Sequence, residues 1–160
     1  GLVPAIRRYA AEGHKYRLIV SLTSALPDRR AELLPVAGKF AIDDLADALR
    51  SYEAGEGSKG RTTVAWVLMS GTNTSAAEAE ALQAAFGDLR LRVNLIDVND
   101  ARADGFSPPS DAERDGFIDA LQALRVPVVR RYSGGKARHA ACGMLASAST
   151  ALPVLSDESL

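Results

Sequence analysis

The chain has 160 residues, the size of a single domain, and 47% of them are hydrophobic and 24% charged. This composition is that of a globular protein and excludes disorder, collagen-like sequence and coiled coil as the dominant state. The net charge of −1 gives no global basic excess, so any contact with RNA must be local. The single cysteine, Cys142, excludes an internal disulfide and a zinc or iron–sulfur site made from this chain's thiolates alone.

No run of apolar residues is long enough to span a membrane, and the first residues do not have the pattern of a secretory leader. We therefore expect a cytoplasmic protein with no membrane partner. The chain has no initiator methionine and enters a helix-like segment at once. We interpret it as a possible fragment of a larger protein.

Apolar runs alternate with segments of helical periodicity, which predicts an α/β fold with parallel strands. The predicted strands span residues 16–23, 62–69, 91–98 and 127–131. The predicted helices span residues 42–52, 75–86 and 111–124, and the Pro- and Arg-rich stretch after residue 23 is predicted to be a loop. Ser75 and Ser110 are predicted N-caps, with Glu78 as the capping-box partner of Ser75 and Gly87 ending that helix. Two arrangements fit: half of a (βα) barrel, or a small three-layer sandwich.

Polar residues follow three of the predicted strands, where open α/β sheets and barrels bind their ligands. They are Ser21, Leu22 and Thr23, then Ser70 and Gly71, and finally Asn99. Their hydroxyl and amide groups could bind a small molecule. The alternative is that they are turn residues, because Ser, Thr and Asn also favour turns for local backbone reasons.

Cys142 follows His139 at a spacing that suggests a thiolate–imidazole pair, although a lone cysteine between small residues is also typical of inert packing. The surrounding stretch is basic and contains a Gly134-Gly135 pair, which favours an anion-binding loop. A solvated loop that balances the acidic helix at residues 42–52 is the other interpretation. The basic residues of this stretch are Arg125, Arg130, Arg131, Lys136 and Arg138. Phosphate-binding motifs rich in glycine are absent.

Taken in order, these motifs resemble the radical S-adenosylmethionine RNA adenine C2-methyltransferases, the RlmN/Cfr-type family, over residues 1–145. The matching segments are Ser21-Leu22-Thr23 with Arg30 and Pro35, Gly60-Arg61-Thr62-Thr63, Asn94-Leu95-Ile96-Asp97-Val98-Asn99, and Ala140-Ala141-Cys142-Gly143-Met144-Leu145.

The resemblance implies the C-terminal half of a six-stranded partial (βα) barrel at residues 1–146, with a C-terminal strand and loop. Residues 147–160 have little to anchor them and are predicted to form a flexible tail. It implies S-adenosylmethionine as cofactor, bound by Ser21, Leu22, Thr23 and Asn99. It also implies a 4Fe-4S cluster whose cysteine ligands lie upstream of this chain, so that the chain alone is inactive.

By the same resemblance, Cys142 is the catalytic residue that accepts a methyl group on its way to C2 of an adenine in 23S ribosomal RNA or transfer RNA. Arg130, Arg131, Lys136 and Arg138 are then candidate RNA-binding residues. The chain has Thr23, Ala65, Asp97 and Met144 where the family has His, Glu, Pro and Gln.

These departures favour, as an alternative, a divergent or degenerate, non-catalytic module that binds S-adenosylmethionine or RNA. A thiol enzyme that uses His139 and Cys142 is a third hypothesis. A half barrel also exposes an unpaired edge at residues 16–23, which predicts possible self-association.

Overall fold

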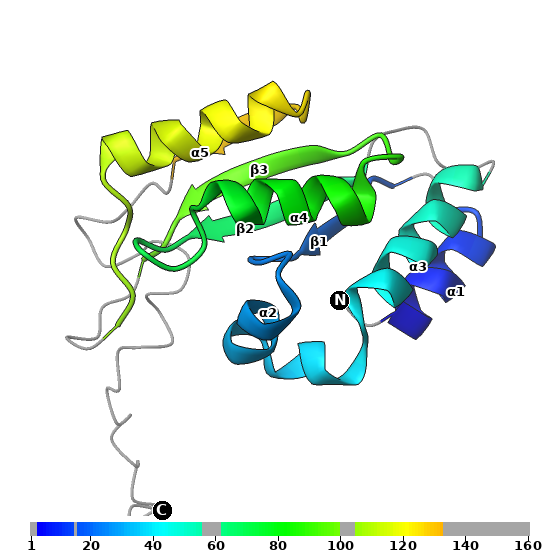
Figure 1. The fold of residues 1–160 in the computed structure, drawn as a ribbon. Coiled ribbons are helices and arrows are strands. Elements are labelled where there is room, and N and C mark those ends of the chain that lie inside the picture. The colour runs from blue at the N-terminus through cyan, green and yellow to red at the C-terminus, as the bar shows by residue number, and fades with distance from the viewer. Residues whose placement is uncertain (1–2, 15, 56–61, 100–104, 133–160) are drawn as a thin grey trace, which may run out of the picture.

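The computed structural model describes residues 3–14, 16–55, 62–99 and 105–132 and contains one sheet of four parallel strands (Figure 1). The strands are β1 (Ile19–Ser21), β2 (Thr63–Leu68), β3 (Arg92–Asp97) and β4 (Val128–Arg131). The helices are α1 (Val3–Ala11), α2 (Pro27–Leu33), α3 (Ile42–Ala54), α4 (Ala76–Phe86) and α5 (Asp111–Ala123), with a 3-10 turn η1 at Pro35–Lys39. The predicted α/β fold with alternating strands and helices is confirmed.

The strand order decides between the two arrangements that periodicity left open. The strands lie in sequence order, β1-β2-β3-β4, and each pairs in parallel with the one before it. When every crossover steps in the same direction with the usual right-handedness, the connecting helices fall on one face of the sheet. Figure 1 shows α4 and α5 side by side on such a face, where they contact each other. The described part of the chain is therefore wound like half a barrel and not like a three-layer sandwich.

The core lies between the helices and one face of the sheet. Alternate residues of the strands point to it, because side chains in a strand alternate between the two faces. They include Val20, Val64, Trp66, Val93 and Leu95, all buried. The opposite face carries more polar residues, among them the exposed Ser21 and Arg131 and the buried Asn94.

Two predictions about the first strand and its loop are wrong. β1 is only three residues long, because Leu22–Ser24 turns away and the carbonyl of Tyr16 accepts hydrogen bonds from the hydroxyls of Tyr9 and Tyr52. The predicted loop after it contains α2, which Pro27 begins at a position where no N–H is needed.

One capping prediction holds and another does not. The Ser110 side chain accepts a hydrogen bond from the Glu113 amide, as expected of an N-cap. Ser75 precedes α4 but makes no side-chain cap, and Glu78 does not complete a capping box. The Glu78 side chain instead reaches the loop after β1.

The predicted boundary at residue 146 and the predicted tail at 147–160 lie outside the described residues. Within the described ranges, none of the helices has the length and hydropathy that a membrane crossing requires.

Candidate functional site

All four strands run in parallel, so their carboxyl ends lie at the same end of the sheet, and 'edge' refers here to that end. The Leu22 amide still donates to the Ala65 carbonyl at 3.1 Å, and the Val98 amide donates to the Leu68 carbonyl at 3.0 Å, just before Asn99. The structure thus places Ser21–Thr23 and Asn99 at the same edge, on strands that flank β2. Their predicted position at the ends of the strands is thus observed, and their role in binding stays a prediction.

The three predicted residues on the β1 side present different groups. The Ser21 side chain is exposed. The Leu22 side chain is 1% exposed and belongs to the core, so only the Leu22 backbone could touch a ligand. Thr23 is 8% exposed and has a φ of 64°, in the left-handed region that a β-branched residue rarely adopts. A backbone held in such a region costs of order 1–3 kcal/mol, and such residues cluster at functional sites.

The side chains of Asn73 and Glu78 form hydrogen bonds with the turn at Thr23 and with the residues that follow it. The Asn73 side-chain amide donates to the carbonyl oxygens of Thr23 and Val67 at 2.6 and 2.7 Å. The Glu78 carboxylate accepts from the Ser24 hydroxyl and the Ala25 amide at 2.7 and 2.9 Å. Both side chains are buried. Sequence reasoning missed both roles, because the partners lie about fifty positions away.

At the end of β2, hydrogen bonds to Glu113 of α5 hold the loop that leads to α4. Its carboxylate accepts hydrogen bonds from the Ser70 hydroxyl at 2.8 Å, the Gly71 amide at 2.7 Å and the Thr74 hydroxyl. The bonds from Thr74 first, and then from Gly71, lower the pKa of Glu113 below its usual value. Ser70 and Gly71, which the sequence offered as ligand contacts, are therefore already engaged within the fold.

At the end of β3, Asp97 forms a two-pronged ion pair with Arg114. Nε and Nη2 of Arg114 donate to the two carboxylate oxygens of Asp97, both at 3.0 Å, and Nη2 also donates to the Pro109 carbonyl at 3.0 Å. The hydrogen bonds to Asp97 first, and then the bond to Asp111, raise the pKa of Arg114. Among the residues that the structure describes, the Asn99 side-chain amide, two residues on, donates one long hydrogen bond of 3.5 Å to the Asp97 carbonyl.

The two arginines of β4 lie on opposite faces of the sheet. Arg130 pairs in register with Leu95, on the helix-covered face; one of its nitrogens lies 3.9 Å from Asp97, and its guanidinium lies 4.8 Å from the Tyr132 ring centroid. Arg131 pairs with Ile96 and points to the open face. Strand alternation therefore separates two side chains that the sequence grouped into one basic stretch. Lys136, Arg138, His139 and Cys142 lie outside the described residues.

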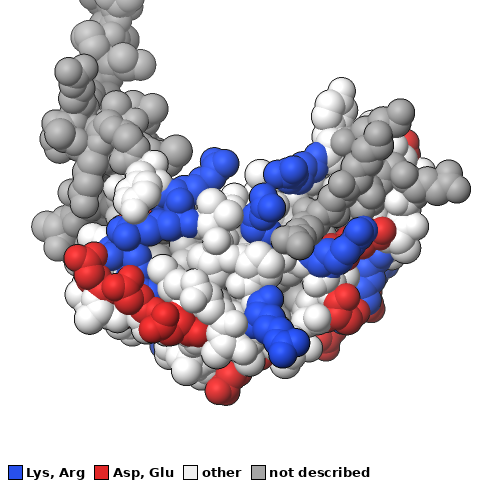
Figure 2. Space-filling view, turned by 90° about the horizontal axis from the view of Figure 1, so that it is seen from above, with Lys and Arg blue, Asp and Glu red and all other residues white. Residues whose placement is uncertain are grey.

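The open side of the molecule is hollowed and basic. Figure 2 shows a hollow in the molecular surface with Lys and Arg side chains on both flanks. By register, Arg92 and Arg131 lie on the sheet face that the helices leave uncovered. A concave surface with this charge suits an anionic polymer such as RNA.

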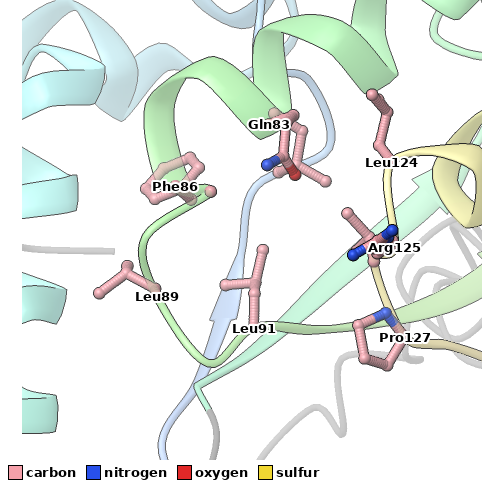
Figure 3. A pocket seen from close by; sticks show the side chains of 10 residues that line it. Gln83, Phe86, Leu89, Leu91, Leu124, Arg125 and Pro127 are labelled. Atoms are coloured by element: carbon pink, nitrogen blue, oxygen red, sulfur yellow. The ribbon is translucent and has the colours of Figure 1, made fainter.

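A pocket of about 240 Å³ lies at the opposite edge of the sheet. Figure 3 shows it between the last turn of α4, with Gln83 and Phe86, and the turn before β4, with Arg125 and Pro127. It contains none of the predicted site residues. Barrel folds place their active sites at the carboxyl ends of the strands, so we do not assign the function to this pocket.

The described residues include no group of three or more His, Cys, Asp or Glu side chains arranged to hold a metal ion. The whole sequence has one cysteine, whereas a 4Fe-4S cluster is held by several thiolates. The residues of this chain do not fit such a cluster.

The known proteins that this chain resembles in sequence are RNA methyltransferases. No protein-family model matches the chain. The chain is 47% identical over 149 residues to a probable RNA methyltransferase of Anaeromyxobacter sp. (strain Fw109-5), covering 92% of this chain and 43% of the relative. It is 36% identical over 148 residues to a probable dual-specificity RNA methyltransferase RlmN of Chlorobium luteolum, covering 92% of this chain and 40% of the relative.

A solved structure agrees with these relatives. The crystal structure of a radical SAM methyltransferase from Sphaerobacter thermophilus matches with a TM-score of 0.83 and 38% identity, over 90% of this chain and 42% of that one. The chain spans well under half the length of the curated relatives it matches. The chain is therefore homologous to one part of the RlmN-type radical SAM RNA methyltransferases, over about nine tenths of its own length.

Proposed function

We propose that this chain supplies part of the S-adenosylmethionine site and the methyl-accepting thiol of an enzyme that methylates C2 of adenine in 23S ribosomal or transfer RNA. The observation that supports it most is the meeting of Ser21–Thr23 and Asn99 at one sheet edge, in a chain homologous to RNA methyltransferases. The cluster ligands belong to the part of the protein that this chain does not span. Alone, the chain is inactive.

The residues at the strand ends fit the cofactor. The exposed Ser21 hydroxyl and the Asn99 amide offer hydrogen-bonding groups for the ribose and the amino acid part of S-adenosylmethionine. The carbonyl oxygens of Leu22 and Thr23, which can each accept a second hydrogen bond, offer acceptors for the base. The bound cofactor supplies the methyl group and the radical chemistry. Arg131, on the open face, binds the RNA backbone, together with Arg130, Lys136 and Arg138.

Cys142 carries the methyl group. Its thiolate forms a bond to the methyl carbon as the bond between that carbon and the sulfonium sulfur breaks, which leaves S-adenosylhomocysteine; the thiol proton goes to solvent. A thiolate suits this step because it is a soft nucleophile.

Binding of S-adenosylmethionine tests the proposal by isothermal titration calorimetry. The wild-type chain should bind, and Asn99→Ala should weaken the affinity about tenfold, the factor expected for one lost hydrogen bond of about 1.4 kcal/mol. Gln122→Ala removes an exposed amide on α5 and serves as the matched control. No heat with the wild type would contradict the cofactor site, and an unchanged affinity for Asn99→Ala would contradict the role of Asn99.

The alternative is a non-catalytic module that binds S-adenosylmethionine or RNA. Thr23 favours it, because the strained turn carries a threonine where the family has histidine. The test uses a protein that also carries the part of the relatives' length that this chain does not span. Cofactor binding there without any methylation of Cys142, measured as the mass of one added methylene unit on the cysteine peptide, would support this alternative.

We also propose that the β1 edge pairs with a second copy of the chain. No described strand pairs with its outer side, and Ile19 there is 53% exposed, beside an apolar groove lined by Ile6, Tyr9 and Leu18 of about 410 Å³. Unpaired strand edges promote association, and a lysine on the edge opposes it. Ile19→Lys should shift the sedimentation coefficient to that of a monomer, whereas Val129→Lys on β4 should not. A wild-type monomer at high concentration would contradict the pairing.

A further inference from the structure

Thr23 is the central residue of a tight three-residue turn. The Ser24 amide donates to the Leu22 carbonyl at 2.8 Å, and the φ of Thr23 is 64°. This combination corresponds to a γ-turn of the rare, strained form. A threonine left to itself would adopt a negative φ, so something in the fold must keep the turn in place.

Asn73 holds one side of the turn. Its side chain is fully buried and uses all its hydrogen-bonding groups at the ends of two strands: it donates to Thr23 and Val67, and its oxygen accepts from the Met69 amide at 2.9 Å. The carbonyl of Asn73 accepts from the Trp66 indole at 3.3 Å. The turn is thereby fixed relative to the end of β2 and to the core.

Glu78 holds the other side. Its carboxylate, 1% exposed, accepts from the Ser24 hydroxyl, the Ala25 amide and, at 3.4 Å, the Leu26 amide. None of these bonds comes from a cation. Within the described ranges no Lys or Arg pairs with this buried carboxylate, so it depends on these donors, and its placement fixes Ser24 and Ala25 closely.

We propose that Asn73 and Glu78 are positioning residues that keep the Leu22–Ser24 turn in the conformation that receives S-adenosylmethionine. The inference rests on the proposed function. Both side chains are buried and act through the turn, not by touching the cofactor. Affinity is gained when a binding segment is already ordered in its bound conformation, and small displacements of a site cost binding.

A purely structural role and a positioning role predict different results. Loss of a structural contact lowers stability but leaves the affinity of the folded molecules unchanged. Loss of a positioning contact weakens the affinity of molecules that remain folded. The affinity for S-adenosylmethionine at a temperature where each variant is fully folded, checked by circular dichroism, therefore separates the two.

Glu78→Gln is the principal variant, because it keeps the volume but leaves one acceptor oxygen in place of two, so that either the Ser24 hydroxyl or the Ala25 and Leu26 amides lose their acceptor. We expect the affinity to fall about tenfold or more. Faster hydrogen exchange of the Ala25 amide should accompany the loss. Glu53→Gln is the matched control. The Glu53 carboxylate accepts hydrogen bonds from the amide and hydroxyl of Thr62 and from the backbone amide of Arg90, near the amino ends of β2 and β3 and away from the proposed site. This variant should lower stability and leave the affinity within about twofold of the wild type.

Two further variants keep the proposal testable. Asn73→Asp retains the acceptor for Met69 and loses the donor to Thr23, so it should weaken binding as well; Ser24→Ala removes a single hydroxyl and provides the mildest change if the others fail to fold. In a Thr23→Gly background, Glu78→Gln should cost less affinity, because glycine adopts a positive φ without being held.

The outcomes are distinguishable. If the wild-type chain does not bind S-adenosylmethionine, the proposed function and this inference both fall. If the wild type binds and the Glu78, Asn73 and Ser24 variants all bind as well as Glu53→Gln does, the proposed function stands and the positioning role is overturned.

Discussion

Replacement of Trp66 by alanine should lower the free energy of unfolding by about 3–5 kcal/mol, the usual cost of removing a large aromatic side chain from a core. Trp66 is 0% exposed in the middle of β2, and its ring centroid lies 5.5 Å from that of Phe117 on α5. It therefore joins the sheet to the helix layer. Urea denaturation followed by circular dichroism measures the change.

Trp66→Phe is the control for this variant. It keeps an aromatic ring against Phe117 and loses the indole N–H that donates to the Asn73 carbonyl, so its cost should be smaller. A loss below about 0.5 kcal/mol for Trp66→Ala, the range of surface substitutions, would contradict the packing described for the core.

Replacement of Cys142 by alanine should abolish methyl transfer to RNA. The assay needs a protein that carries both this chain and the part of the relatives' length that it does not span, under anaerobic conditions with S-adenosylmethionine and RNA. Alanine has no group that can accept the methyl carbon, so no product should form above background.

Binding of S-adenosylmethionine should survive in Cys142→Ala, because the proposed cofactor contacts are at Ser21–Thr23 and Asn99. That retained affinity shows that the variant is folded. Methylated RNA at the wild-type rate from Cys142→Ala would remove Cys142 from the mechanism and leave a different carrier to be found.

Much of the fold could be predicted because its elements have strong periodicity. The observed β2, β3 and β4 each lie within one residue at either end of the predicted spans, and α5 ends one residue earlier than predicted. Periodicity reports which residues are buried, but not which face of the sheet a helix covers. Only the strand order distinguished the half barrel from the sandwich.

The candidate site could be predicted in part. The strand-end rule placed Ser21–Thr23 and Asn99 at one edge without any knowledge of contacts. It could not find Asn73 or Glu78, because their partners lie far away in sequence and nothing local marks them. Glu78 was even misread as a capping-box residue, since its spacing from Ser75 satisfies that local rule while tertiary contacts decide its actual partner.

The basic stretch shows a second limit of prediction from the sequence. Arg130 and Arg131 are neighbours in sequence, and counting charges treats them as one surface. In a strand they face opposite sides, and Arg130 lies near Asp97 and Tyr132 while Arg131 lies on the face that the helices leave uncovered. By register, only Arg131 of the two lies on that face of the sheet.

The central claim is that S-adenosylmethionine binds at the carboxyl ends of β1 and β3. The most direct test is an NMR titration of the isotope-labelled chain that follows backbone amide shifts as the cofactor is added. Our account predicts saturable shifts at Ser21–Ser24 and at Asn99 and none at the pocket around Phe86 and Arg125. Shifts confined to that pocket, or no shifts at saturating cofactor, would contradict it.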